Sequence, residues 1–126
     1  MARDPNIPDE FNVYTLVILR RPTDAPDLPD EELGRLQSLH LAHRAELRDR
    51  GLAVANGPFL EQSDESFRGM SIFTCDLAEA ARLNEDDPLV IAGRLAYEVM
   101  EWWIAADTLA FPNGNAPDDR RSLPDY

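Results

Sequence analysis

The hydrophobic pattern of the chain begins with a stretch that is apolar on two sides. Residues 12–20 (NVYTLVILR) are rich in β-branched and aromatic side chains, which is typical of a strand. Alternate positions of a strand point to opposite faces. Here one face carries Val13, Val17 and Leu19, and the other carries Tyr14, Leu16 and Ile18. The pattern predicts a strand that is buried on both sides.

The next periodic segment predicts a long helix from residue 30 to about residue 50. Asp30 is placed to cap its start, and Gly51 follows its end as a stop signal. Apolar and histidine positions recur at spacings of three and four, at Leu33, Leu36, His40, His43 and Leu47. Both histidines of the chain therefore lie on the apolar side of one helix, one turn apart.

The remaining pattern completes an α+β fold. Strands are predicted over 52–57, 69–75 and 94–105, and Asp76 caps a helix that runs to about residue 85. Asp87 and Pro88 begin a further turn that ends at Gly93. The order β-α-β-β-α-β is the ferredoxin-like arrangement, a four-stranded antiparallel sheet with two helices on one face.

The second face of this sheet needs a cover. The first strand is apolar on both sides, and Trp102 and Trp103 point to opposite sides of the last strand. Sheet-to-sheet packing of two identical subunits is the simplest cover, so we expect a homodimer.

The chain length of 126 residues suits one domain. Residues 1–11 carry prolines and charges and are expected to form a flexible lead. Residues 12–105 form the predicted domain. Residues 106–126 contain three prolines and are expected to form a tail without a core of its own, one that packs on the partner subunit.

Charge and composition exclude several function classes. The net charge is −12, so phosphate backbones and anionic membranes are repelled and neither is an expected partner. The chain has no lysine, which excludes Schiff-base chemistry and a P-loop. With one cysteine and two histidines we expect no metal and no cofactor. The first ten residues do not resemble a signal peptide, which favours a cytoplasmic location.

His40 and Asp87 each have a structural and a chemical interpretation. A histidine on a core stripe is more often a buried structural residue, but an imidazole paired with a carboxylate can shuttle a proton at neutral pH. Asp87 can cap the turn that Pro88 begins, and the same carboxylate can orient an imidazole. No suitably placed nucleophile accompanies them, because Cys75 is expected to be a small buried hydrophobic residue. The pair therefore favours proton transfer over covalent catalysis.

Two further residues are candidates for the wall of a pocket. His43 lies one turn beyond His40, but no third ligand has the spacing that a metal site needs, so a packed or pocket-lining histidine is expected. Phe59, in the turn Asn56-Gly57-Pro58-Phe59, either closes a strand or lines a pocket mouth. Arg94 is a candidate contact for an anionic substrate or a surface ion pair.

Three stretches of the chain resemble the YCII-related family, which includes the DGPF-type proteins. They are His40-Leu41-Ala42 with Leu47 and Gly51, then Asn56-Gly57-Pro58-Phe59-Leu60-Glu61, with Asn56 where aspartate is usual, and 87–93 (DPLVIAG). The resemblance implies a dimeric α+β barrel, a pocket between sheet and helices, and a catalytic dyad that maps to His40 and Asp87. A serine often begins the family's third strand; Gly69, Met70 and Ser71 compete for that position, and Ser71 is the candidate for substrate binding.

Three functions follow as hypotheses. The first is a small cofactor-independent enzyme that transfers protons in an elimination or isomerisation, the lyase and isomerase activities that the resemblance implies. Its substrate is a small organic molecule, with cyclic and phenolic compounds as candidates. The second is a non-catalytic, dimeric ligand-binding or accessory protein of a small-molecule pathway. The third is cofactor-free, monooxygenase-like activity.

Overall fold

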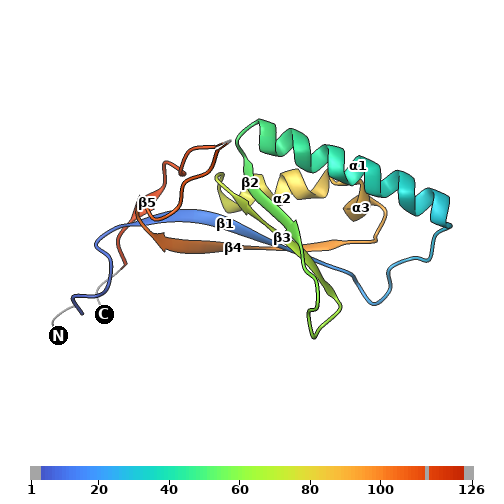
Figure 1. Cartoon of the computed structure of the whole chain (residues 1–126), viewed down its shortest axis with the longest axis horizontal. Helices are drawn as coiled ribbons and strands as arrows, with labels where there is room; N and C mark the ends of the chain where they lie inside the picture. Colours follow the sequence, from blue (N-terminus) through green and yellow to red (C-terminus); the bar gives the residue numbers. More distant parts are fainter. Residues whose placement is uncertain (1–3, 113, 124–126) are drawn as a thin grey trace.

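The computed structural model describes residues 4–112 and 114–123. Its elements are β1 (Phe11–Arg20), α1 (Asp30–Asp49), β2 (Ala53–Pro58), β3 (Phe67–Phe73), α2 (Leu77–Glu85), α3 (Pro88–Ile91), β4 (Ala96–Ala105) and β5 (Arg120–Arg121) (Figure 1). The α+β class and the β-α-β-β-α-β order of the first four strands are confirmed. The predicted count of four strands is wrong, because the described part of the sheet has five.

β1 is the central strand of this sheet, as its two apolar faces predict. The strands lie in the order β2-β3-β1-β4, and every pairing is antiparallel. β4 pairs with β1 over its full length, from Phe11 opposite Ala105 to Arg20 opposite Ala96. On its other edge, β1 pairs with β3 from Thr15 onward and with β5 at Phe11 and Asn12. β5 therefore fills the edge position that β3 leaves empty.

The helices start and stop at recognisable signals. α1 begins at Asp30 itself, after Pro29, so the prediction that Asp30 caps the helix is wrong: its carboxylate lies in the first turn, where it suits the helix dipole. The stop at Gly51 is confirmed by its φ of 74°, a left-handed conformation that glycine adopts without strain. Asp76 caps α2, accepting a hydrogen bond from the Glu79 backbone N–H at 2.9 Å.

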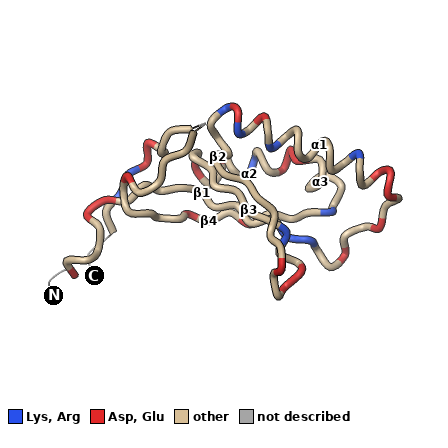
Figure 2. The backbone as a smooth tube through the Cα atoms, viewed as in Figure 1, with Lys and Arg blue, Asp and Glu red and all other residues tan. Residues whose placement is uncertain are grey.

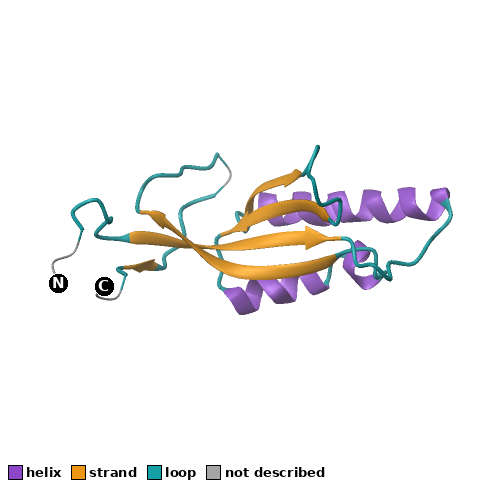
Figure 3. Cartoon of the chain, turned by 90° about the horizontal axis from the view of Figure 1, so that it is seen from below, coloured by secondary structure: helices purple, strands orange, loops and turns teal. Residues whose placement is uncertain are grey.

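All three helices cover one face of the sheet, and the view in Figure 3 is of the other face. The main hydrophobic core lies between sheet and helices; it includes Val17 and Leu19 of β1, Leu36 and Leu47 of α1, and Phe73 of β3. A second, smaller cluster on the opposite face contains Tyr14, Val54 and Ile72. The two faces of β1 thus belong to two separate cores.

The segment that follows β4 folds back onto the sheet of the same chain. Leu109 and Phe111 pack on the second cluster, and the rings of Phe111 and Tyr14 meet edge to face with centroids 5.9 Å apart. The expected lead 1–11 and tail 106–126 extend beyond the described residues, at 1–3, 113 and 124–126. None of the helices within the described ranges is long and apolar enough to cross a membrane.

Candidate functional site

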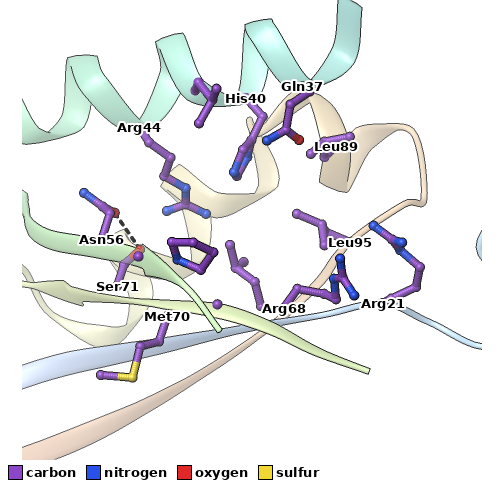
Figure 4. A pocket seen from close by; sticks show the side chains of 15 residues that line it. Arg21, Gln37, His40, Arg44, Asn56, Arg68, Met70, Ser71, Leu89 and Leu95 are labelled. Carbon is purple, nitrogen blue, oxygen red and sulfur yellow. Dashed lines mark hydrogen bonds between the residues drawn. The ribbon is translucent and has the colours of Figure 1, made fainter. Parts of the chain in front are cut away.

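A cavity of about 310 Å³ opens between α1 and the ends of β1, β2 and β3 (Figure 4). α1 contributes Gln37, His40, Leu41 and Arg44 to its wall, and Leu89 of α3 and Leu95 lie nearby. The strand side consists of Leu19, Arg21, Asn56, Gly57, Pro58, Arg68, Gly69, Met70 and Ser71. The cavity therefore has apolar walls, several polar side chains and room for a small ligand.

His40 and Asp87 form a direct pair beside this cavity. The Nδ1 atom of His40 lies 2.7 Å from Oδ2 of Asp87, and the two side chains are 12% and 0% exposed. An ionised carboxylate only accepts hydrogen bonds, so Nδ1 carries the proton in this contact. Nε2 is then the nitrogen that is left to accept or deliver a proton, and the ring lines the cavity.

Asp87 has both of the roles that the sequence leaves open. Its Oδ1 accepts a hydrogen bond of 2.9 Å from the Leu89 backbone N–H and caps α3, while Oδ2 faces His40. Burial alone raises the pKa of this carboxyl, but the interactions with His40 and His43 and the Leu89 N–H outweigh burial and hold the pKa well below its usual value. Asp87 is therefore an anion at neutral pH.

Arg44 is a member of the site that sequence reasoning missed. It is 5% exposed, and its Nη2 donates to Oδ1 of Asn84 and lies 3.3 Å from Oδ2 of Asp87. Its Nε and Nη1 have no hydrogen-bond partner among the described residues, and its guanidinium faces the Phe73 ring at 5.9 Å. The sequence did contain a signal for this role, because Arg44 follows His40 by four residues and therefore lies on the same apolar side of α1.

Ser71 is the residue of its trio that points into the cavity. Its register pairs it with Val17 and Asn56, on the face of the sheet that the helices cover. Its hydroxyl donates to Oδ1 of Asn56 at 2.6 Å, and Figure 4 shows both side chains at the cavity while Met70 points away. This arrangement follows from the alternation of side chains along β3.

The structure does not bring His43 and Phe59 to the cavity wall. His43 is on the side of Asp87, with Nδ1 3.7 Å from Oδ2, which is longer than a hydrogen bond. The ring of Phe59 packs edge to face on Phe67 and lines a separate surface depression with Pro58 and Ile72. Both therefore lie next to the site without lining it.

The surroundings of Cys75 and Arg94, the two other residues considered in the sequence analysis, favour a structural role over a chemical one. Burial raises the pKa of Cys75 to about 11, so its thiol stays protonated and is a poor nucleophile at neutral pH. Arg94 donates to the Pro26 carbonyl at 2.9 Å and is not part of the cavity wall. Among the described residues, no three histidine, cysteine or acidic side chains are grouped as a metal site.

Comparison with solved structures finds proteins of similar fold. No family model matches the chain, and no curated protein matches it by sequence. The chain is similar to the structure of 5-chloro-2-hydroxyhydroquinone dehydrochlorinase (TftG) from Burkholderia phenoliruptrix AC1100, in complex with 2,5-dihydroxybenzoquinone. The TM-score is 0.53 and the identity 19%, over 71% of this chain and 92% of that one. At this identity the similarity supports the α+β fold.

Proposed function

We propose that the protein is a small enzyme that needs no cofactor and transfers protons on a small cyclic organic substrate. His40 is the general acid and base, and Asp87 is its positioning residue. The observation that carries this proposal is the 2.7 Å contact between His40 Nδ1 and the fully buried Asp87 carboxylate, beside a cavity that the imidazole lines. That geometry presents Nε2 to a bound molecule as a base of fixed orientation.

Asp87 and Arg44 support the imidazole in different ways. The carboxylate fixes the ring and balances the positive charge that forms when Nε2 takes a proton. Arg44 lies 3.3 Å from the same oxygen and adds a second positive charge next to it. Because Asp87 is also anchored by the Leu89 N–H, its position does not depend on the histidine. The imidazole therefore cycles between its two charge states in a fixed setting.

An elimination or isomerisation is the reaction class that these groups support. In an elimination from a hydroxylated ring, a hydroxyl proton moves to the carbon that bears the leaving group. A second hydroxyl proton is then lost as the leaving group departs with its electron pair, and a quinone remains. Each step needs one base that can give its proton back, and His40 fills that role. The structural neighbour, a dehydrochlorinase of a hydroxyhydroquinone, supports this class of chemistry.

The same proposal includes the YCII-related family and a homodimer. The open face of the sheet carries Met100 and Trp102, each 40% exposed, next to the partly buried Leu16 and Ile18 of β1. A second copy of this chain is the occupant that a two-sided apolar strand favours. We expect Trp102→Glu to convert the dimer to a monomer in size-exclusion chromatography with light scattering, whereas Leu60→Glu, at a side chain 84% exposed elsewhere, leaves it unchanged.

The tautomer of His40 tests the proton-transfer proposal. Long-range ¹H–¹⁵N correlation spectra of the wild type, recorded at a pH at which the ring is neutral, are expected to show its proton on Nδ1. In Asp87→Asn the new amide donates to Nδ1 and the proton moves to Nε2, so the base is lost. Asp86→Asn, at a neighbouring carboxylate that is 68% exposed, is the matched control and leaves the tautomer unchanged. An identical tautomer in all three proteins contradicts the proposal.

Turnover separates the enzyme from a binding protein. With chlorinated hydroxyhydroquinones as test substrates, His40→Gln is expected to lower chloride release by roughly a hundredfold or more. Binding of 2,5-dihydroxybenzoquinone, the ligand of the structural neighbour, is expected to survive the substitution. If the wild type binds such rings and His40→Gln changes only the affinity, the ligand-binding alternative replaces the enzyme.

A further inference from the structure

The cavity beside His40 has the opposite charge to the rest of the protein. The chain carries 24 acidic residues against 12 basic ones. Among the described residues that line the cavity, however, three are arginines, Arg21, Arg44 and Arg68, and none is acidic. Figure 2 shows acidic positions spread along most of the backbone, with a basic stretch at the end of β1. In a protein of net charge −12, the overall composition does not explain why the cavity wall is positively charged.

Two of these arginines have no carboxylate to neutralise them. Arg21 donates to the Arg94 carbonyl at 3.4 Å, and Arg68 donates to the Glu65 carbonyl at 3.3 Å. No ion pair joins either one to an acidic side chain within the described residues, whereas Arg20 on the opposite face of β1 pairs with Glu98 at 3.2 Å. Arg21 and Arg68 therefore keep donors for a carboxylate that the protein does not supply.

These arginines also repel one another. Burial lowers the pKa of Arg21, and the neighbouring positive charges of Arg94 and Arg68 lower it further. In Figure 4 the Arg21 and Arg68 side chains gather with Leu95 at one side of the cavity, away from Asn56 and Ser71. Like charges at a half-buried site are unfavourable unless an anion binds between them.

We propose that the cavity binds a single-ring organic acid whose carboxylate is held by Arg21 and Arg68. The ring lies against Leu19, Leu89 and Leu95, and its reacting end faces His40. The inference rests on the proposed function and specifies its substrate class. Arginine matches the two oxygens of a carboxylate with paired donors. A volume of about 310 Å³ suits one ring with small substituents.

A matched pair of ligands tests this inference on the intact chain. 2,5-Dihydroxybenzoate and its neutral amide, 2,5-dihydroxybenzamide, differ in charge and are alike in shape. By calorimetry at low salt, we expect the acid to bind about tenfold or more tightly than the amide. The preference should shrink as salt is added, because the arginines are open to solvent on one side. Equal binding of the two compounds, or no binding of the acid at millimolar concentration, overturns the inference.

Variants locate the preference in the cavity. The double variant Arg21→Gln with Arg68→Gln is expected to bind acid and amide equally, while Arg21→Lys keeps part of the preference. Arg48→Gln with Arg50→Gln, two exposed arginines at the C-terminal end of α1 and its C-cap, removes the same amount of charge and is expected to keep the preference. If this control loses as much as the cavity variant, the effect belongs to the net charge and the inference fails.

The result is distinguishable from the test of the proposed function. His40→Gln is expected to retain the preference for the acid, because the carboxylate lies at the other end of the cavity. A protein that shows the expected His40 tautomer without any preference for the acid keeps the proton-transfer proposal and loses this one. A protein that prefers the acid but lacks the expected His40 tautomer keeps the carboxylate inference and loses the proton-transfer proposal.

Discussion

The two faces of the sheet are built from alternate residues of the same strands, yet they differ in what they bury. The face under the helices buries Val17 and Leu19 and, beside them, an ionic network that contains Asp87 and Arg44. The opposite face buries Tyr14, Val54 and Ile72, with Leu109 and Phe111 of the chain's own tail against them. One face combines packing with charge, and the other relies on packing.

This difference shows where a charge can be kept away from water. A buried ion is costly unless hydrogen bonds and an opposite charge satisfy it. Asp87 meets that condition through His40, Arg44 and the Leu89 N–H, which come from two helices. The open face has no helix to supply such partners. It buries the Asn12 side chain, whose Oδ1 accepts a hydrogen bond from the Asp107 backbone N–H, and the Tyr14 hydroxyl, which has no hydrogen-bond partner among the described residues.

The largest expected effect comes from removing the charge at the centre of the helix-covered face. Asp87→Asn keeps the cap of α3 but leaves Arg44 without its anion, and we expect it to lower the free energy of unfolding by about 3 kcal/mol at pH 7. Urea denaturation measures this loss. Asp86→Asn, at an exposed carboxylate, is the control and is expected to unfold as the wild type does.

The lowered pKa of Asp87 determines how the difference in free energy of unfolding between wild type and Asp87→Asn depends on pH. The unfolded chain has an ordinary aspartate pKa of about 3.9. The folded protein has a lower one, so the stabilisation by the carboxylate is complete above the unfolded value and is lost as pH falls toward the folded value. The gap between wild type and Asp87→Asn should therefore be constant near neutrality and close in acid. A gap that widens on acidification contradicts the assignment.

The helix-covered face of the sheet is easier to predict from the sequence than the opposite face. The alternation in residues 12–20 and the three- and four-residue spacings of α1 predict the core strand and the helix that covers it. β5 was not predictable, because Arg120 and Arg121 are two exposed charged residues with no apolar alternation. Its pairing depends on the space beside β1 that a shorter β3 leaves open.

Some residues of the candidate site were predictable from the local sequence pattern, and others come together only through the fold. His40 and Ser71 fall on predictable faces of a helix and a strand. Arg44 shares the stripe of His40, but whether an arginine on such a stripe reaches solvent or turns inward depends on Asn84 and Asp87, forty or more residues later. Arg21 and Arg68 lie on separate segments, so their meeting in one cavity is a property of the fold.

A smaller effect is expected from crowding the cavity side of β3. A side chain at Gly69 would meet the Gly57 carbonyl oxygen of β2 at 2.6 Å, so the strands must separate to admit it. We expect Gly69→Ala to lower the free energy of unfolding by about 2 kcal/mol, as overpacking does. Gly34→Ala, where no atom lies within 4 Å of the added carbon, should raise it by about 0.5–1 kcal/mol, because alanine favours the helix. If Gly69→Ala proves neutral, the two strands are not held at this distance.

The smallest expected effect belongs to the open face. Phe111 is partly exposed and packs edge to face on Tyr14, so Phe111→Ala should cost about 1 kcal/mol in urea denaturation. Leu60→Ala, at a side chain 84% exposed, is the control and should change nothing. Removing the Phe111 ring also exposes Tyr14, whose pKa is raised first by burial and then by the charge of Asp107. The tyrosine should therefore titrate closer to its ordinary value in Phe111→Ala. If its titration is unchanged, the tail does not shield this face in solution.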